Sequence, residues 1–447
     1  MSKTALKILF ILPEYYPHSG GGISTYYIHL LKSLAPVCEK IKVIVGSGYT
    51  QENNSFNIDN VEVDYLKPVI YKKYLSKFNS YEILPGFQKN IAAAWAMWEQ
   101  SNEGQGYDII ECTDFGLGFI PWLTHHTKPV ITRLHGSYGQ VELNELGANT
   151  EFIGNFYRLT ELSLLSKSDA LITHSLNNKT FWQELLPGKK IELLNPIYLQ
   201  EREKNLPYEE KQKFGMVSGR IQQWKGPDVL CEAFNYLKNT SISIRWYGRD
   251  TNYDSTASKS TILKNLYPKL WGETISLHPP LPHVELLEIQ KKALFGIVPS
   301  TWDMFNFTCL EYLSNGTPLI CSSNAGAAYL ITHGVNGFVY ANNSPKELAL
   351  CIEKMIALSA TQYKQMVMEG YHLIDQFLSP EIVIPQNLAI FSATIERHHK
   401  TSSNRYLKTV FSPSQKGSSI NEILDDLPMK LVFNYLLKRI KKYMSKR

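Results

Sequence analysis

Apolar runs of strand length recur along the first half of the chain and alternate with stretches of helical periodicity. The run "LKILFIL" at residues 6–12 is typical of a strand that is covered on both faces. Similar runs occupy residues 40–46, 107–113, 129–135 and 169–175. The residues between them include helical stretches such as 24–34. Strands that alternate with helices predict a doubly wound, mostly parallel sheet.

The composition changes near residue 198. The stretch "YLQEREKNLPYEEKQK" at 198–213 is charged and aperiodic, which indicates a linker. A second series of apolar runs then occupies residues 213–219, 241–248, 275–281, 295–300, 318–323 and 337–340, with helical stretches at 228–237 and 284–293. We therefore predict two Rossmann-like α/β domains, at 1–197 and 213–378, joined by a linker at 198–212. A length of 447 residues also exceeds what one core supports.

The C-terminal part is expected to differ from both domains. Residues 379–400 are expected to form a helix that packs back on the N-terminal domain. Residues 401–424 are rich in Ser, Asn, Lys and Thr, which indicates loose order. The stretch "LPMKLVFNYLLKRIKKYMSKR" at 427–447 predicts a basic amphipathic helix. Such a helix could lie on an anionic membrane or dock on the protein, and the sequence leaves both alternatives open.

Composition and charge limit the class of protein. The apolar fraction of 44% and the charged fraction of 19% are those of a folded globular protein. A net charge of +5 gives no indication of nucleic-acid binding. Six scattered cysteines without a C-x-x-C motif favour a reducing compartment. No apolar run approaches the ~18 residues needed to cross a bilayer. We expect a cytoplasmic protein, with any membrane contact being peripheral and at the inner face.

A turn with two cations follows the first strand of the second domain. In "SGRIQQWKGPDVL" the predicted strand ends at Gly219, and Arg220 and Lys225 lie in the turn before Gly226 and Pro227. Ligands of open α/β sheets bind beyond the carboxyl ends of the strands. Two cations at that place suit an anion such as a pyrophosphate. The alternative is that both are solvated loop charges.

The stretch "VPSTWDMFNFTCLEYLSNGTPLICSS" at 298–323 supplies a second half to the same predicted site. If a helix begins near residue 307 or 308, its first amides favour a phosphate. These amides belong to Phe305, Asn306, Phe307 and Thr308. Asp303 and Glu311 would then lie about 12 Å or more apart. That separation suits one carboxylate on a sugar and the other on a ribose. The alternative is that Asp303 caps the helix and Glu311 pairs on its surface.

The stretches "SGRIQQWKGPDVLCEAFNYL" and "PSTWDMFNFTCLEYLSNGTPLI" together resemble glycosyltransferase family 4, the retaining GT-B enzymes. The resemblance extends from "PEYYPHSGGGISTYYIHLLKSLA" to "HGVNGFVY". It implies two Rossmann-like domains that face each other across a cleft, with the acceptor on the N-terminal one. Two positions depart from the family pattern. Asp303 replaces the first acid of E-x7-E, and Tyr329 stands where many members have Glu.

The resemblance also implies roles for the residues of the C-terminal domain. Arg220 and Lys225 would bind the donor diphosphate, Glu311 the ribose and Asp303 the donor sugar. Charge builds up on the departing diphosphate when the sugar–phosphate bond breaks. Fixed cations and helix amides stabilise that charge more than the ground state, so they can replace a metal.

Two further candidates lie in the N-terminal domain. The glycines of "HSGGGIST" at 18–25 let the backbone approach a phosphate, although such a turn can be merely a turn. The resemblance implies that Gly21 and Gly22 lie near the donor. It also places His135, just past a predicted strand, near the transferred sugar. A lone histidine is more often structural.

These observations predict a retaining hexosyltransferase. It would move a sugar from a nucleoside-diphosphate donor to a hydroxyl of a saccharide or lipid-linked acceptor, in polysaccharide or glycolipid assembly. No D-x-D, H-E-x-x-H or Cys/His spacing is present, so no metal and no cofactor are expected. The alternatives on the same fold are a nucleotide-sugar epimerase, a phosphorylase and a non-catalytic homologue that binds a sugar nucleotide.

Overall fold

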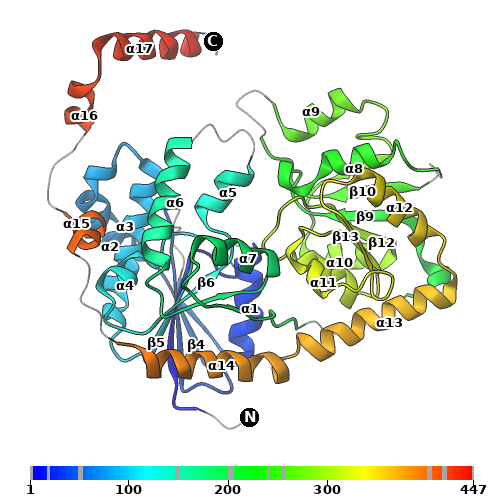
Figure 1. The fold of residues 1–447 in the computed structure, drawn as a ribbon, viewed down its shortest axis with the longest axis horizontal. Helices are drawn as coiled ribbons and strands as arrows, with labels where there is room; N and C mark the ends of the chain where they lie inside the picture. Colours follow the sequence, from blue (N-terminus) through cyan, green and yellow to red (C-terminus); the bar gives the residue numbers. More distant parts are fainter. Residues whose placement is uncertain are drawn as a thin grey trace.

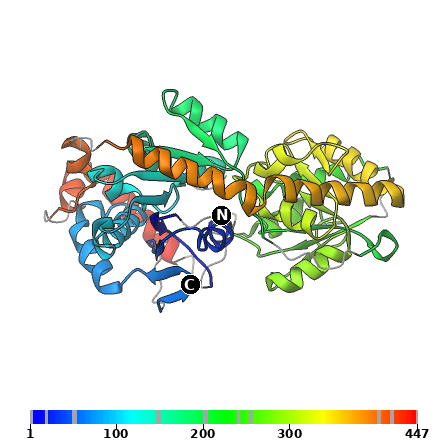
Figure 2. The ribbon, with the colours of Figure 1, turned by 90° about the horizontal axis from the view of Figure 1, so that it is seen from below.

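The computed structural model describes most of the chain as two α/β domains followed by a C-terminal tail (Figure 1). The described residues are 4–17, 21–48, 54–145, 151–199, 206–238, 242–252, 257–399, 405–414 and 420–444. The two domains lie side by side, and each is built around one sheet (Figures 1 and 2). The two Rossmann-like domains expected from the sequence are thereby confirmed.

The N-terminal domain contains an eight-stranded sheet in the order β3-β4-β2-β1-β5-β6-β7-β8. All neighbouring strands are parallel except β3 and β4. The strands are β1 Lys7–Leu12, β2 Lys40–Val45, β3 Phe56–Ile58, β4 Val61–Tyr65, β5 Ile109–Thr113, β6 Val130–Leu134, β7 Ala170–Thr173 and β8 Ile191–Leu193. The helices are α1 Gly22–Leu34, α2 Pro68–Lys77, α3 Pro85–Gln100, α4 Ile120–His125, α5 Tyr138–Asn144, α6 Glu151–Leu165 and α7 Leu176–Leu185.

Both faces of this sheet are covered, which explains the continuous apolar runs. Along β1, Phe10 points to the face that α1 covers, and Leu9 and Ile11 point to the face that α3 covers. All three side chains are buried. Because alternate side chains of a strand point to opposite faces, a strand covered on both faces needs apolar residues at successive positions.

The C-terminal domain repeats this design with a six-stranded, fully parallel sheet in the order β11-β10-β9-β12-β13-β14. The strands are β9 Gln212–Ser218, β10 Ser243–Tyr247, β11 Ile275–His278, β12 Ala293–Val298, β13 Leu319–Ser322 and β14 Phe338–Tyr340. The helices are α8 Pro227–Ala233, α9 Lys259–Leu266, α10 His283–Lys292, α11 Phe307–Ser314, α12 Pro345–Ile356 and α13 Ala360–Phe377.

The chain then returns to the first domain. Helix α13 lies along the C-terminal domain, and α14 (Pro380–Arg397) continues along the N-terminal domain (Figures 1 and 2). Asn387 of α14 accepts a hydrogen bond from Arg133 of β6 at 3.0 Å. The first domain is therefore completed by a helix that follows the second domain in sequence.

Part of the segment that we expected to be loosely ordered is instead packed on the N-terminal domain. Helix α15 (Arg405–Phe411) buries Phe411, and the indole of Trp95 donates to the carbonyl of Phe411 at 2.7 Å. The hydroxyl of Tyr81 donates to the carbonyl of Val410 at 2.5 Å. The polar composition of this segment gave no sign of the packing, because the packing depends mainly on one large apolar side chain, that of Phe411. Residues 401–404 and 415–419 of that segment lie outside the described residues.

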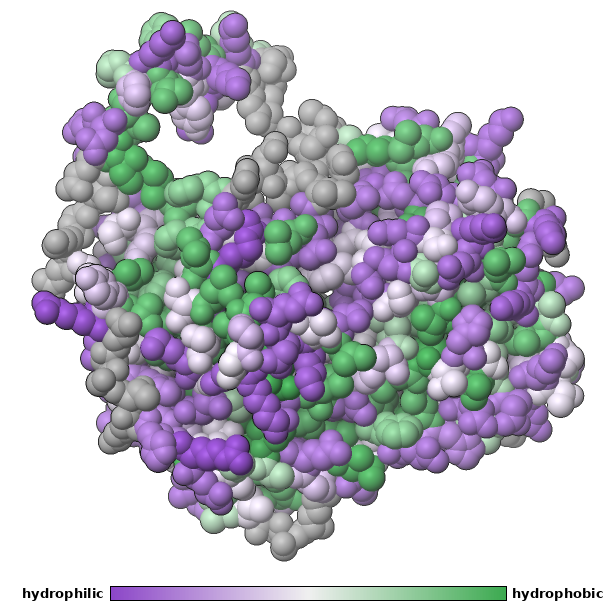
Figure 3. All heavy atoms as spheres, viewed as in Figure 1, coloured by the Kyte–Doolittle hydropathy of each residue, from purple (hydrophilic) through white to green (hydrophobic). Residues whose placement is uncertain are grey.

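The tail ends in two helices, α16 (Ile420–Asp426) and α17 (Met429–Met444). Large apolar side chains of α17, including Met429, Phe433, Leu436 and Ile440, are exposed. The helix stands clear of both domains in Figure 1, and Figure 3 shows that it carries hydrophobic and hydrophilic residues together. Among the described residues, no helix is both long and apolar enough to cross a bilayer.

A buried ion pair holds the N-terminal domain together between β5 and β6. Arg133 donates to Glu111 through Nε at 2.7 Å and through Nη2 at 2.9 Å, and both side chains are 0% exposed. Tyr27 of α1 also donates to Glu111 at 2.8 Å. The pair therefore links two strands with α1 and, through Asn387, with α14.

We expect Arg133→Met to lower the free energy of unfolding by about 3–5 kcal/mol, because the substitution leaves the Glu111 carboxylate buried without its cation. Urea denaturation of the full chain measures this change in the transition that includes the N-terminal domain.

The matched control is Lys73→Met. Lys73 pairs with Glu99 at 2.7 Å on the surface, where half of the lysine side chain is exposed. Such a pair contributes at most about 1 kcal/mol. Similar losses in the two variants would show that the buried pair has no special role.

Candidate functional site

Lys225, one of the two residues predicted to bind the diphosphate, lies in direct contact with Asp303, which was predicted to bind the sugar. Lys225 Nζ contacts Asp303 Oδ2 at 2.5 Å, and both side chains are largely buried. Lys225 ends a short 3-10 helix (Gln223–Lys225) that follows β9, and Asp303 lies in the loop after β12. Since β9 and β12 are parallel neighbours, their carboxyl ends meet at one edge of the sheet. The sequence predicted that the residues after these two strands share one site, because ligands of open α/β sheets bind beyond the carboxyl ends of the strands.

A glycine makes this approach possible. Gly226 has φ 69°, in the left-handed region that favours glycine. A Cβ at this position would lie 1.9 Å from the carbonyl oxygen of Pro299. The turn that carries Lys225 can therefore pass close to the loop after β12 only without a side chain at position 226.

Asn306, and not Asp303, caps helix α11. The side chain of Asn306 accepts a hydrogen bond from the amide of Thr308 at 3.2 Å, and α11 begins at Phe307. The amide group of Asn306 also donates to Asp303 Oδ2 at 2.9 Å. The capping alternative for Asp303 is wrong, because an Asn three residues later fills that position and orients the carboxylate. Phe305 and Phe307 are buried beside it, with ring centroids 5.1 Å apart.

Glu311 lies on α11 and makes polar contacts with α10. His283 Nε2 lies 3.3 Å from Glu311 Oε1, and Gln290 donates to Oε2 at 3.3 Å. Glu311 is mostly buried, whereas His283 is mostly exposed. The hydrogen bond with Glu311 raises the pKa of His283 and outweighs the opposite effect of burial. The carboxylate is therefore oriented from one side by α10.

The glycine turn has a different environment from the one expected. Gly21 is the N-cap of α1, and Gly22 begins that helix. The carboxylate of Glu14 accepts the amide of Ser24 at 3.1 Å. A Cβ on Gly21 would lie 2.4 Å from Glu14 Oε1, whereas one on Gly22 would meet nothing within 4 Å. The helix terminus that was predicted for a phosphate thus holds a carboxylate of this chain. Gly20 lies outside the described residues.

Burial raises the pKa of Glu14, and the hydrogen bond from Ser24 and the charge of Arg220 partly offset this effect. Arg220 is itself exposed. Burial also raises the pKa of Glu145, and the charge of Arg220 partly offsets that rise as well. Arg220 therefore belongs to the C-terminal domain but acts on carboxylates of the N-terminal domain. This places it at the boundary between the two domains.

His135, which is partly buried, pairs with the buried His174 at the carboxyl ends of β6 and β7. His135 Nδ1 lies 3.2 Å from His174 Nε2. The outer nitrogens, His135 Nε2 and His174 Nδ1, are buried and have no hydrogen-bond partner among the described residues. Burial lowers the pKa of His135 well below its usual range, and His174 and Arg133 add to this effect. The imidazole is therefore neutral near pH 7, so it can donate or accept one hydrogen bond.

The loop after β12 meets this histidine pair across the domain boundary. Gly136 has φ 104°, and a Cβ there would lie 2.6 Å from Met304 Cγ. The rings of His174 and Phe305 are 6.0 Å apart. His135 and Asp303 are thus brought to the same region by contacts of their immediate neighbours.

Two residues of this region, Asp114 and His174, were not predicted from the sequence. Asp114 accepts the amides of His135 at 2.7 Å and Gly136 at 3.2 Å, and burial raises its pKa to about 7. His174 pairs with His135. Asp114 directly follows the predicted strand at 107–113, and His174 lies near the end of the predicted strand at 169–175, so their position at a carboxyl end was an available signal.

Tyr329, which replaces a Glu of the family pattern, connects the domains. Its hydroxyl donates to Asn195 Oδ1 at 2.6 Å. A cavity of about 170 Å³ lies beside it, between the start of α7 and the residues after β13. The cavity is lined by none of the predicted site residues. Among the described residues, three metal-ligating side chains cluster elsewhere, at the amino ends of β6 and β7.

Comparisons with known proteins bear on the family and the fold. Residues 199–372 match the family model described as glycosyl transferases group 1. The D-inositol 3-phosphate glycosyltransferase of Thermobispora bispora is 20% identical over 416 residues, which cover 85% of this chain and 92% of that protein.

Two solved structures share the fold. Sucrose-phosphate synthase of Thermosynechococcus elongatus has a TM-score of 0.67 at 16% identity, over 87% of this chain and 99% of that one. Anabaena HepE in complex with UDP-glucose has a TM-score of 0.58 at 15% identity, over 87% of this chain and 100% of that one. Residues 199–372 therefore match the family of glycosyl transferases group 1, on a chain with the GT-B fold.

Proposed function

We propose that this protein is a retaining hexosyltransferase that takes its sugar from a nucleoside diphosphate and needs no metal for the transfer. The observation that carries the proposal is the contact between Lys225 and Asp303 at 2.5 Å, beside the capped start of α11. It would supply a cation for a phosphate and a carboxylate for sugar hydroxyls side by side, from two loops at one edge of the sheet. The acceptor would be a hydroxyl of a saccharide or a lipid-linked saccharide.

The donor would lie along the carboxyl edge of the second sheet. Arg220 and Lys225 would bind the diphosphate, and the amides of residues 305–308 would add donors at the start of α11. Glu311, oriented by Gln290, would accept hydrogen bonds from the ribose. Anabaena HepE is known in complex with UDP-glucose, so we take UDP-glucose as the first donor to test.

The chemistry follows from these positions. As the bond between the anomeric carbon and the phosphate oxygen breaks, negative charge builds up on the diphosphate, and fixed cations stabilise it. The departing phosphate would take the proton of the acceptor hydroxyl, which attacks the same face of the sugar. His135, being neutral, would direct its unpartnered Nε2 to a sugar hydroxyl rather than carry a charge. Two cations and a helix terminus can do the work of a metal, which supports metal independence.

The C-terminal helix α17 supports action on a membrane-bound acceptor at the cytoplasmic face. Its apolar side chains are exposed, and it carries Lys438 and Lys441, both exposed, within the last turns. This arrangement favours binding to an anionic surface over docking on the protein. It fits assembly of a polysaccharide or glycolipid. The side chain of Lys442 lies outside the described residues.

A nucleotide-sugar epimerase and a non-catalytic homologue remain the competing functions. An epimerase would convert the donor sugar without releasing a nucleoside diphosphate. A non-catalytic homologue would bind the donor without turnover, and Asp303 and Tyr329 are the departures that keep it in consideration. Release of UDP from UDP-glucose in the presence of EDTA would exclude both.

We expect Arg220→Ala and Lys225→Ala each to lower kcat/KM for the donor by about 100-fold or more, because each removes a charge aimed at the leaving group. The measurement is the rate of UDP release by the full chain with excess EDTA.

Lys213→Ala is the control, since Lys213 is an exposed lysine of β9 in the same domain. Its kcat/KM should match that of the unmodified protein. Full activity in both Arg220→Ala and Lys225→Ala would remove the diphosphate assignment.

We expect Asp303→Ala to weaken the binding of UDP-glucose about 10-fold or more, because a charged hydrogen bond to the sugar is lost. Binding of UDP alone should stay equal or become tighter, since Lys225 is released from its partner. Calorimetric titration of both ligands measures the difference. If the substitution weakens the binding of UDP and the binding of UDP-glucose equally, then Asp303 orients Lys225 and does not bind the sugar.

We expect the full chain to bind vesicles of phosphatidylcholine and phosphatidylserine, and not vesicles of phosphatidylcholine alone. Lys438→Glu with Lys441→Glu should weaken binding about 30-fold or more, at ~1 kcal/mol for each lysine. Sedimentation with vesicles measures it. The control variant carries the same charge change at Lys264 and Lys269, which are exposed on the C-terminal domain. Equal loss in the control would assign the binding to net charge rather than to α17.

A further inference from the structure

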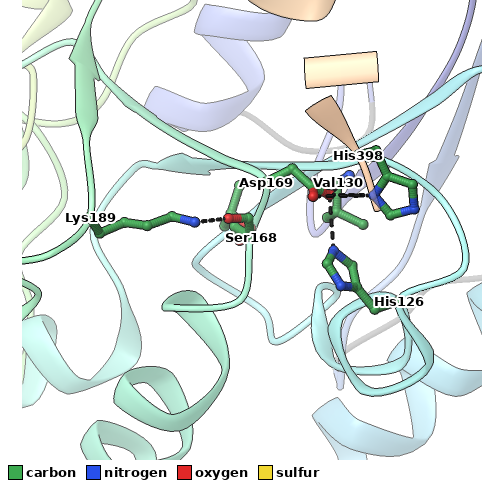
Figure 4. A network of polar contacts seen from close by, with 7 residues as sticks. His126, Val130, Ser168, Asp169, Lys189 and His398 are labelled. Carbon is green, nitrogen blue, oxygen red and sulfur yellow. Dashed lines mark hydrogen bonds and ion pairs between the residues drawn. The ribbon is translucent and has the colours of Figure 1, made fainter. Parts of the chain in front are cut away.

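Three side chains from distant segments meet at the end of the N-terminal domain opposite the candidate site. His126 follows α4, Asp169 directly precedes β7, and His398 ends α14. Figure 4 shows both imidazoles turned toward the carboxylate of Asp169. Because β6 and β7 are parallel, the residues before them lie at the amino edge of the sheet, whereas His135 and His174 lie at its carboxyl edge. The cluster is therefore separate from the donor site.

The three side chains lie close enough together to share one ion. His126 Nε2 lies 3.0 Å from Asp169 Oδ2, and His398 Nδ1 lies 3.2 Å from each carboxylate oxygen. All three ligating atoms lie within 4.8 Å of one another. Two donors bound at about 2.1 Å to one ion lie about 3.0 Å apart at a right angle and about 3.4 Å at a tetrahedral angle. The two histidine–aspartate distances fall within this range.

The surroundings orient the three groups and exclude most water. The side chains of His126, Asp169 and His398 are 7%, 14% and 9% exposed. The amide of Val130 donates to Asp169 Oδ2 at 2.8 Å, which fixes the carboxylate as an outer-shell partner would. His126 has φ 46° and ψ 47°, a left-handed conformation that costs a non-glycine residue about 1 kcal/mol or more. The fold thus maintains an unfavourable backbone that presents this imidazole.

A carboxylate, that of Asp169, lies within the cluster, and the amino group of Lys189 lies beside it. Burial alone would raise the pKa of Asp169, but the hydrogen bonds from His126, Val130 and His398 outweigh it and lower the pKa. Lys189 bonds to the carbonyl of the adjacent Ser168 (Figure 4). Burial lowers the pKa of Lys189, and Asp169 opposes this effect. The amide of Val130 holds the carboxylate in place, and the side chain of Lys189 lies beside the cluster, where a positive charge would limit the affinity for a cation.

We propose that His126, Asp169 and His398 bind one divalent transition-metal ion, with Zn²⁺ as the best match to two imidazoles and a carboxylate. Three protein ligands of these types are a common set for Zn²⁺, with water completing the coordination. The ion would join α14 to the strands β6 and β7. Its role is structural, and the transfer reaction at the opposite edge proceeds without it.

The test uses the untagged full chain after removal of metals with a chelator. Titration with Zn²⁺ should show one tight site, and the melting temperature should rise when the site is filled. His398→Ala and His126→Ala should each weaken this site about 10-fold or more, whereas His399→Ala should not. His399 is the matched control because it is the next residue and is exposed.

Titration with Co²⁺ keeps the proposal testable if a histidine variant fails to fold. The unmodified protein should give the visible absorption bands of Co²⁺ with imidazole ligands, and Zn²⁺ should displace them. A pure hydrogen-bond network, in which both imidazoles donate protons to Asp169, would give no such bands and no Zn²⁺ site, and would overturn the proposal.

Donor turnover separates this inference from the proposed function. EDTA should lower the melting temperature of the Zn²⁺-loaded protein while its rate of UDP release at low temperature stays unchanged. Binding of Zn²⁺ that is equal in His398→Ala and in the unmodified protein would also overturn the site, whatever the activity shows.

Discussion

The buried ion pair of Arg133 and Glu111 is the constraint on which the N-terminal domain depends. Two charges without water are tolerated only when they are paired and hydrogen-bonded, and here Nε and Nη2 of Arg133 are matched whereas Nη1 has no hydrogen-bond partner among the described residues. The pair therefore fixes β5 against β6 and recruits Tyr27 and Asn387 from two helices. Arg133 also lies two residues before His135, so the strand that carries this ion pair also carries that imidazole at its carboxyl end.

Much of the fold could be predicted, because strands covered on both faces leave continuous apolar runs. The eleven runs named in the sequence correspond to eleven strands. Three strands were missed. Polar residues alternate along β4 (Val61–Tyr65), β3 (Phe56–Ile58) is largely exposed, and Glu192 interrupts the short strand β8 (Ile191–Leu193). Helix α15 was missed because its docking rests mainly on Phe411.

The candidate site could be predicted in part. Residues next to strand ends, such as Lys225 and Asp303, are marked by their position, and the structure brings them together. Their direct pairing depends on how two loops fold over one edge, which spacing does not encode. The cap at Asn306 was hidden by the neighbouring acid. The cluster around Asp169 joins segments 43 and 229 residues away, so no local motif could reveal it.

The course of the chain through α13 and α14 determines the order in which the protein is completed during synthesis. Domains usually fold as they leave the ribosome, the N-terminal one first. Here the first domain lacks Asn387 for Arg133 and Phe411 for Trp95 until almost the whole chain has emerged. The second domain is contiguous and can finish earlier. The N-terminal domain is therefore synthesised first but completed last. A fragment that ends at the linker would lack these contacts and would expose part of the core of that domain.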